Sequence, residues 1–227
     1  FRGIELFNNS SYGDAITYFN KSLASPLDEK TTALSQFWKA ESFYSLNNYE
    51  EASKAYLEFL YNPAAIGLPS YHLTNYNLGY CYFKSGDYAN ALVWFRKYIA
   101  IKEETDKPRF EDALMRTADA FFVTKDYFNA VDFYTEAINN KAKASDYALF
   151  QKGILLGIQA QLAQKIITLQ QLTDNYKESA YYDDAVYETA NAHFLQGEND
   201  KALGLFKAIT EQYSGSSYVS KALLGMA

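Results

Sequence analysis

Internal repetition is the feature that most constrains what this chain can fold into. A small residue is followed twelve positions later by a second small residue, usually alanine, and four positions after that by a large apolar residue, usually aromatic. These triplets are Gly3, Ala15, Phe19; Ala40, Ala52, Tyr56; Gly79, Ala91, Phe95; Ala118, Ala130, Tyr134; the degraded Gly153, Lys165, Leu169; Ala190, Ala202, Phe206; and a seventh that begins at Gly225. The first members lie 35 to 39 positions apart. A unit of this length cannot bury its own apolar face, so the units must stack on one another.

Within one unit the apolar residues follow a helical period. Tyr88, Ala91, Leu92 and Phe95 stand at i, i+3, i+4 and i+7, which places them on one face of a helix and does not fit strand alternation. Turn-forming residues separate the two halves of most units, namely 8–11, 47–48, 85–87, 125–126 and 196–199. Each unit is therefore predicted to be a pair of antiparallel helices. In the fifth unit the corresponding place holds 159–161, Gln-Ala-Gln, which is the weakest turn signal.

Composition excludes several classes of protein. The 227 residues carry a net charge of -6 with a pI near 5.0, which disfavours general binding to nucleic acid or to anionic lipid. A mean hydropathy of -0.30 and the lack of a long apolar run predict no membrane insertion. One cysteine and two histidines predict neither an internal disulfide nor a metal site. The aromatic fraction, 17%, is unusually high, so the positions of the aromatic side chains in the fold need an explanation.

No arrangement typical of catalysis is present in the sequence. A Gly-rich phosphate loop, a His-Glu-x-x-His helix and a Gly-x-Ser-x-Gly elbow are all missing. His193 is expected to be a buried, hydrogen-bonded imidazole, and Cys81 a small buried thiol rather than a nucleophile. The sequence therefore predicts a protein that is not an enzyme, without a catalytic residue, cofactor or metal.

The repeated positions resemble the tetratricopeptide repeat. The match is closest where 78–82, Leu-Gly-Tyr-Cys-Tyr, is followed by 86–95, Gly-Asp-Tyr-Ala-Asn-Ala-Leu-Val-Trp-Phe. The opening tryptophan of the motif is absent, and the closing proline is missing except at Pro63. The resemblance implies an all-α fold, a right-handed α-solenoid (superhelix) of antiparallel helix pairs, with the first helix of each pair (helix A) inside and the second (helix B) outside.

The chain is expected to be one array, and a piece of a longer protein because it begins and ends inside a helical pattern. The expected repeats are 1–29 (truncated), 33–66, 72–105, 111–144, 146–179 (degenerate), 183–216 and the start of a seventh at 218–227. Close packing between the helices of a pair is expected at Gly79, Ala91, Phe95, Ala118, Ala130, Tyr134, Ala190, Ala202 and Phe206.

The resemblance also implies a partner-binding groove built from helix A. At its motif positions this sequence has Phe37, Trp38, Tyr44, Tyr76, Tyr80, Phe83, Arg116, Asp119, Phe150 and Tyr187. Such rings commonly pack one repeat on the next. Alternatively, Trp38, Tyr44, Tyr76, Tyr80 and Phe83 form an exposed strip suited to an extended peptide or a helix of another protein.

Two family subtypes can be compared with the sequence. In the repeats that clamp a C-terminal carboxylate, three of five basic or amide positions are replaced here, by Phe37, Glu41 and Asp112, so that ligand is not expected. Asp112, Asp119, Asp184 and Glu188 instead favour a basic partner segment.

The strings 174–181 and 211–218 resemble the corner between repeats in bacterial cell-envelope tetratricopeptide proteins. That likeness favours the bacterial periplasm or cell envelope over the cytoplasm.

Together these observations predict a non-catalytic scaffold whose concave face binds another protein or peptide. The alternative is a regulatory or sensory region of a larger protein, with a small molecule or glycan stacking on groove tyrosines.

Overall fold

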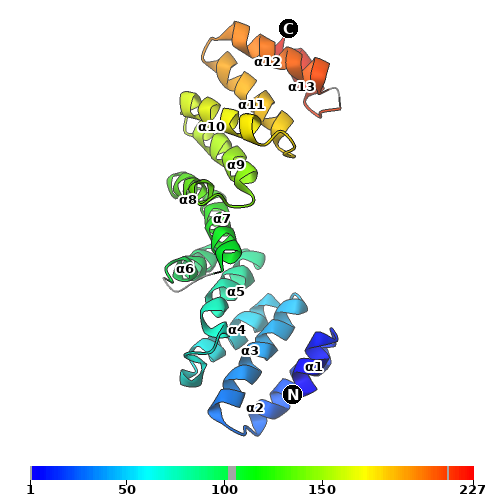
Figure 1. The fold of residues 1–227 in the computed structure, drawn as a ribbon, viewed down its shortest axis with the longest axis vertical. Coiled ribbons are helices and arrows are strands. Elements are labelled where there is room, and N and C mark those ends of the chain that lie inside the picture. Colours follow the sequence, from blue (N-terminus) through cyan, green and yellow to red (C-terminus); the bar gives the residue numbers. More distant parts are fainter. Residues whose placement is uncertain (1, 102–105, 214) are drawn as a thin grey trace. The chain divides into compact units, whose positions relative to one another are not determined.

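The chain is all-α. A computed structural model describes residues 2–101, 106–213 and 215–227, and these contain thirteen α-helices, one short 3-10 helix and no strand (Figure 1). No helix among them is long and apolar enough to cross a membrane. The helices form two compact units, Phe1–Thr124 and Lys125–Ala227. The division falls in the turn inside the expected repeat 111–144, so contact between Ala118 and Ala130 stays a prediction, as do the repeat boundaries.

Unit 1 contains seven α-helices and the 3-10 helix. They are α1 (Arg2–Asn8), α2 (Tyr12–Ala24), α3 (Glu29–Ser45), α4 (Tyr49–Leu60), η1 (Pro63–Ala65), α5 (Ser70–Lys84), α6 (Tyr88–Ile99) and α7 (Lys107–Val123).

Unit 2 contains the remaining six helices. They are α8 (Tyr127–Asn139), α9 (Ser145–Ile158), α10 (Leu162–Asn175), α11 (Tyr182–Leu195), α12 (Asn199–Gln212) and α13 (Val219–Gly225).

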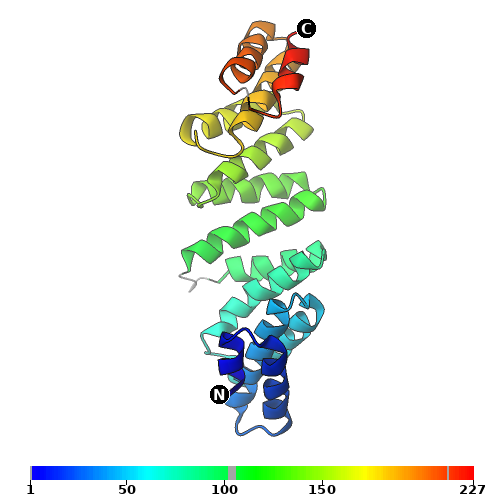
Figure 2. The same cartoon turned by 90° about the vertical axis from the view of Figure 1, so that its right-hand side faces the viewer.

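Within each unit every helix packs on the next one along the chain, as Figure 2 shows from the side. Odd-numbered helices also meet each other: α1 contacts α3, α5 contacts α7, and α9 contacts α11. Even-numbered helices make no comparable contacts in the described ranges. The odd-numbered helices are the helix A elements of the sequence analysis, and these three pairs of them lie closer together than any two even-numbered helices of a unit.

Small residues allow the two helices of a pair to approach. A Cβ atom added to Gly79 in α5 would lie 2.5 Å from Cδ1 of Phe95 in α6. One added to Gly153 in α9 would lie 2.4 Å from Cδ2 of Leu169 in α10. The first and third members of the repeated triplet are therefore direct neighbours in these pairs, which is the contact that the spacing predicts.

The turn inside each helix pair has the same backbone form. One residue in each adopts a positive φ, and these residues are Ser10, Asn47, Gly86, Lys125, Ala160 and Gly197, with φ between 56° and 78°. In three turns the residue after it caps the next helix, as when the Asp87 carboxylate accepts a hydrogen bond from the Asn90 amide at 3.1 Å. The Gln-Ala-Gln segment 159–161 forms this turn despite its weak signal, with Ala160 at 56°.

Candidate functional site

The odd-numbered helices of unit 1 carry most of the predicted groove residues. Trp38 and Tyr44 come from α3, and Tyr76, Tyr80 and Phe83 from α5; all five are half-buried, so part of each ring reaches solvent. We call these five rings, together with Glu41 and Asp112, the helix-A face. Phe37 lies beneath it, with only 6% of its surface exposed, and contacts Tyr56 and Phe59 of α4.

The rings of the helix-A face are held by one another and by the core. Tyr76 and Tyr80 meet edge to face with centroids 5.0 Å apart, and Tyr80 meets Phe83 at 6.5 Å. Trp38 packs on Phe7 of α1 at 5.0 Å. Edge-to-face pairs of this kind fix ring orientation, so the face is ordered before any ligand arrives.

Asp112, near the start of α7, accepts hydrogen bonds from two of these tyrosines. The Tyr76 hydroxyl donates to Asp112 Oδ2 at 2.8 Å, and the Tyr80 hydroxyl donates to the same oxygen. Burial, followed by the neighbouring Asp112 charge, raises the pKa of both tyrosines well above the ordinary value, so both remain donors at neutral pH. Arg116 lies one turn further along α7, with Nε 3.5 Å from Asp112 Oδ1 and Nη1 2.6 Å from Asp119 Oδ2.

Glu41 forms a second carboxylate cluster, between α3, α4 and α5. Its Oε1 accepts hydrogen bonds from the Tyr56 hydroxyl at 2.6 Å and from Asn77 Nδ2 at 2.7 Å. Burial raises the pKa of Glu41, and these two hydrogen bonds oppose that shift. The sequence analysis noted Glu41 only as a mismatch to the carboxylate clamp. Its motif position, equivalent to that of Tyr80 one repeat later, was the signal that could have identified it.

The predicted groove rings of unit 2 stack on other tyrosines of the chain. Phe150 of α9 stacks on Tyr181 with centroids 5.2 Å apart, and Tyr187 of α11 stacks on Tyr218 at 4.6 Å. Both partner tyrosines come from the corner strings of the sequence analysis, so Phe150 and Tyr187 take part in packing between repeats, although both remain half-buried like the rings of unit 1.

A serine in each of the same corners also binds the first turn of an odd-numbered helix, α9 or α11. Ser179 Oγ donates to Asp146 Oδ2 at 2.7 Å and accepts from the Tyr181 amide at 3.1 Å. Ser216 repeats both contacts, donating to Asp183 and accepting from the Tyr218 amide. Ser179, in the loop after α10, is therefore linked to the first turn of α9. Ser216, in the loop after α12, is linked in the same way to the first turn of α11.

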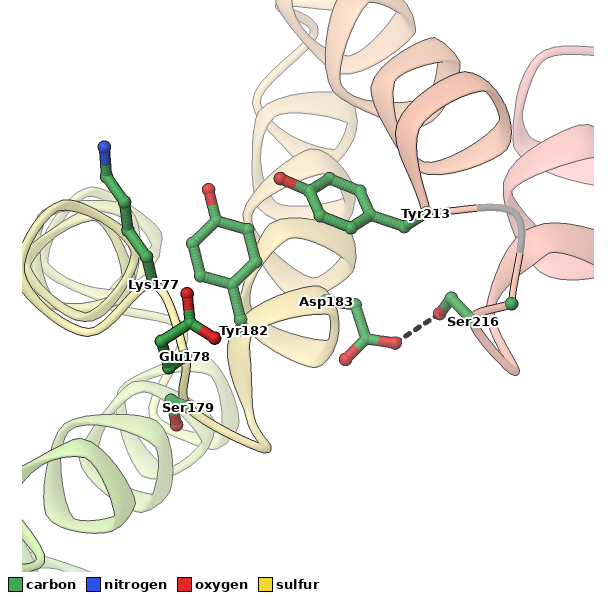
Figure 3. A pocket seen from close by; sticks show the side chains of 8 residues that line it. Lys177, Glu178, Ser179, Tyr182, Asp183, Tyr213 and Ser216 are labelled. Atoms are coloured by element: carbon green, nitrogen blue, oxygen red, sulfur yellow. Dashed lines mark hydrogen bonds between the residues drawn. The ribbon is translucent and has the colours of Figure 1, made fainter.

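A polar pocket of about 410 Å³ lies beside the second corner. It is lined by Lys177, Glu178, Ser179, Tyr182, Asp183, Tyr213, Gly215 and Ser216. Figure 3 shows the rings of Tyr182 and Tyr213 near each other, with the contact between Ser216 and Asp183 beside them. The neighbouring Tyr213, whose ring centroid is 5.5 Å away, and burial raise the pKa of Tyr182 to about 12.

Several acidic groups that suggested a basic partner already have partners within the chain. Asp119 pairs with Arg116, and Glu188 pairs with Lys165. Asp184 lies near the Tyr218 hydroxyl and raises the pKa of that tyrosine.

The two residues considered for chemistry lie where the sequence analysis expected them. His193 is buried, with Nδ1 2.5 Å from Glu198 Oε2. Cys81 is also buried, and burial raises the pKa of its thiol to about 12, which makes it a poor nucleophile.

Comparison with known proteins agrees with this architecture. A family model described as tetratricopeptide repeat matches residues 2–69, 39–106 and 168–217. No curated protein matches the chain.

Solved structures with the same fold share little sequence with it. The structure of YrrB, described as a TPR protein with an unusual peptide-binding site, has a TM-score of 0.63 and 20% identity, over 85% of this chain and 91% of that one. MamA has a TM-score of 0.62 and 18% identity, over 78% of this chain and 95% of that one. A signal transduction ATPase with a tetratricopeptide repeat sensor, from Pyrococcus horikoshii, has a TM-score of 0.68 and 17% identity, over 99% of this chain and 37% of that one. From the repeated triplets, the stacked helix pairs and the matching family model, the chain belongs to the tetratricopeptide repeat family.

Proposed function

We propose that this chain is a non-catalytic scaffold that binds a peptide segment or a helix of another protein on the helix-A face of unit 1. Tetratricopeptide repeat proteins are typically interaction scaffolds, which supports the general role. The observation that carries the specific site is the set of five half-buried rings on α3 and α5, of which Tyr76 and Tyr80 are fixed by Asp112.

Ordered aromatic side chains suit such a role for a physical reason. A ring offers a large contact area and loses little conformational entropy when it is already held in one rotamer. Tyrosine adds a hydroxyl that can meet the polar backbone of a bound segment. Interfaces concentrate their binding energy in residues of this type.

A selection experiment tests the proposal. Random twelve-residue peptides displayed on phage are selected against the chain, and the affinity of the recovered peptides is measured by fluorescence anisotropy. Replacing Tyr44 on the helix-A face with serine is expected to weaken binding. The matched control is Tyr61→Ser, which removes a ring that is 76% exposed at the end of α4 and outside the face. Equal affinity in both variants would contradict the proposed site.

A second candidate function is binding of a small polar molecule or glycan in a regulatory or sensory protein. The pocket beside Tyr182 and Tyr213 supports it, because two tyrosines, Asp183 and Lys177 offer donors and acceptors around one cavity. The sensor named in the Pyrococcus horikoshii protein is a further reason to test it. A screen of monosaccharides and metabolites by thermal shift is expected to find a stabilising ligand whose effect is lost in Tyr213→Ala. A screen without such a ligand would remove this candidate.

The corner strings support a location for this scaffold in the bacterial cell envelope. Both corners make the same serine and tyrosine contacts, so the two strings act as one packing unit that occurs twice in this chain. Fractionation of cells that produce the native protein tests this location, and recovery in the cytoplasmic fraction would contradict it.

A further inference from the structure

We propose that Asp112, Tyr76 and Tyr80 form a subsite for one basic side chain, arginine or lysine, of the bound segment. The inference rests on the proposed function, because it names the chemistry that the helix-A face recognises. It predicts that partners present a cation at one fixed position of the segment.

The first step concerns the charge on Asp112. Both hydroxyls that donate to its Oδ2 are neutral, so they orient the carboxylate without cancelling its charge. Arg116 pairs with Asp112, but it is shared: its Nε lies 3.5 Å from Asp112 Oδ1, and its Nη1 makes the shorter contact, 2.6 Å, with Asp119 Oδ2. The positive charge of Arg109 also acts on Tyr76 and on Glu41. Asp112 therefore shares Arg116 with a second carboxylate, and its side chain is one-third exposed.

The second step concerns what surrounds that carboxylate. The rings of Tyr76 and Tyr80 stand edge to face beside it, both half-buried and both fixed through their hydroxyls. An ordered carboxylate attracts a guanidinium or an ammonium group by an ion pair, and aromatic rings next to it add a cation–π contact when the cation reaches a ring face. Because the groups are already in position, little entropy is lost when the cation arrives.

The third step locates a second carboxylate on the same face. Glu41 lies on α3, one turn before Tyr44, and is hydrogen-bonded to Asn77 of α5, next to Tyr76. Burial raises the pKa of Tyr44 to about 12, with smaller contributions from neighbours that include Glu41 and Asp112. Glu41 is also held by neutral donors, Tyr56 and Asn77. The helix-A face of unit 1 therefore has two carboxylates positioned by neutral hydrogen bonds.

Unit 2 differs in the group that reaches its carboxylate from another helix. There Glu188 of α11 is paired with a lysine, Lys165 of α10. In unit 1 the groups that reach Asp112 from another helix are two tyrosine hydroxyls, which is why we assign the subsite to unit 1.

The test uses the peptides selected by phage display on the complete chain. Each basic residue of a binding peptide is replaced in turn by its neutral counterpart, citrulline for arginine or acetyl-lysine for lysine. One replacement is expected to weaken binding by about tenfold or more, as for loss of a charge-assisted hydrogen bond. Asp112→Asn is expected to weaken binding of the unmodified peptide by a similar factor. The two changes together should cost little more than either alone, because both remove the same contact.

Matched controls separate the possible outcomes. Glu58→Gln removes an exposed carboxylate on α4, outside the helix-A face, and should leave affinity unchanged. If Asp112→Asn does not fold, as judged by circular dichroism, the modified peptides on the unaltered chain still decide the question. Peptides that need Tyr44 but tolerate every neutral replacement would overturn the subsite and leave the scaffold in place. Failure to select any peptide would overturn both.

Discussion

Replacing Gly79 with alanine tests the packing on which the helix pairs depend. Two effects compete. Alanine is favoured over glycine inside a helix by about 1 kcal/mol, which alone would stabilise α5. The new Cβ atom, however, would lie 2.5, 2.7 and 2.8 Å from three atoms of the Phe95 ring, well inside ordinary contact distance.

The Phe95 ring has nowhere to move. It is fully buried, and the rings of Tyr80, Tyr76 and Phe83 surround it with centroids 5.3, 6.1 and 6.3 Å away. Overpacking of a rigid core group costs about 1–3 kcal/mol, and three close atoms place this site toward the upper end. After the helix-propensity gain is subtracted, we expect Gly79→Ala to lower the free energy of unfolding by about 1–2 kcal/mol.

Gly204 is the matched control, because it also lies inside a helix, α12, but an added Cβ would meet nothing within 4 Å. Gly204→Ala should therefore raise the free energy of unfolding by about 0.5–1 kcal/mol. Both variants are compared with the unaltered chain by urea unfolding followed through circular dichroism at 222 nm. The reasoning is refuted if Gly79→Ala is as stable as the unaltered chain, or if the two variants change stability in the same direction.

Three further predictions concern a turn, a carboxylate and a thiol. Ala160→Gly should stabilise the chain by about 0.5 kcal/mol. Glycine relieves the strain of alanine in the left-handed conformation, and part of that gain is lost because glycine makes the unfolded chain more flexible. A lower urea midpoint would contradict this prediction. Burial raises the folded-state pKa of Glu41, so the folded chain binds more protons than the unfolded chain between the two pKa values, and the contribution of Glu41 to stability falls as pH rises through that window. The Glu41→Gln variant keeps an oxygen that accepts from both Tyr56 and Asn77. The stability of this variant relative to the unaltered chain should therefore increase from about pH 4.5 upward. Paired urea titrations that show the same difference at every pH would count against the raised pKa of Glu41. Cys81 should react with Ellman's reagent at pH 8 only after urea unfolds the chain, and rapid reaction of the folded chain would show that the thiol is accessible.

Much of the fold follows from the sequence because the signals are local. The helical period and the turn residues act over a few positions, and the left-handed residue of each turn recurs with the period of the repeated triplet. Even the weak segment 159–161 forms its turn. The helices on either side end and begin in the same places as in the other pairs, and they bring Gly153 against Leu169.

The degraded fifth repeat shows where local signals stop. Lys165 stands where the other repeats have a small alanine, and in the sequence it is only a departure from the pattern. In the structure its side chain is buried beside Gly157 and pairs with Glu188 of α11. Gly157 occupies a motif position where most repeats have a ring, so it leaves room for the lysine chain.

The candidate site also has one part that the sequence predicts and one part that only the tertiary structure shows. The sequence predicted the rings of α3 and α5, because motif positions place them on one side of helix A. It could not show that Phe150 and Tyr187 stack on corner tyrosines while Tyr76 and Tyr80 bind Asp112, because those contacts join residues 31 to 36 positions apart.

The sequence by itself determined the helix pairs, their period and their family, because small side chains and turn residues act between near neighbours in every repeat. Only the tertiary structure decided which group from another helix reaches each carboxylate. At Glu188 that group is a lysine, and at Asp112 it is a pair of tyrosine hydroxyls, because residues more than twenty positions apart meet only when the helices stack.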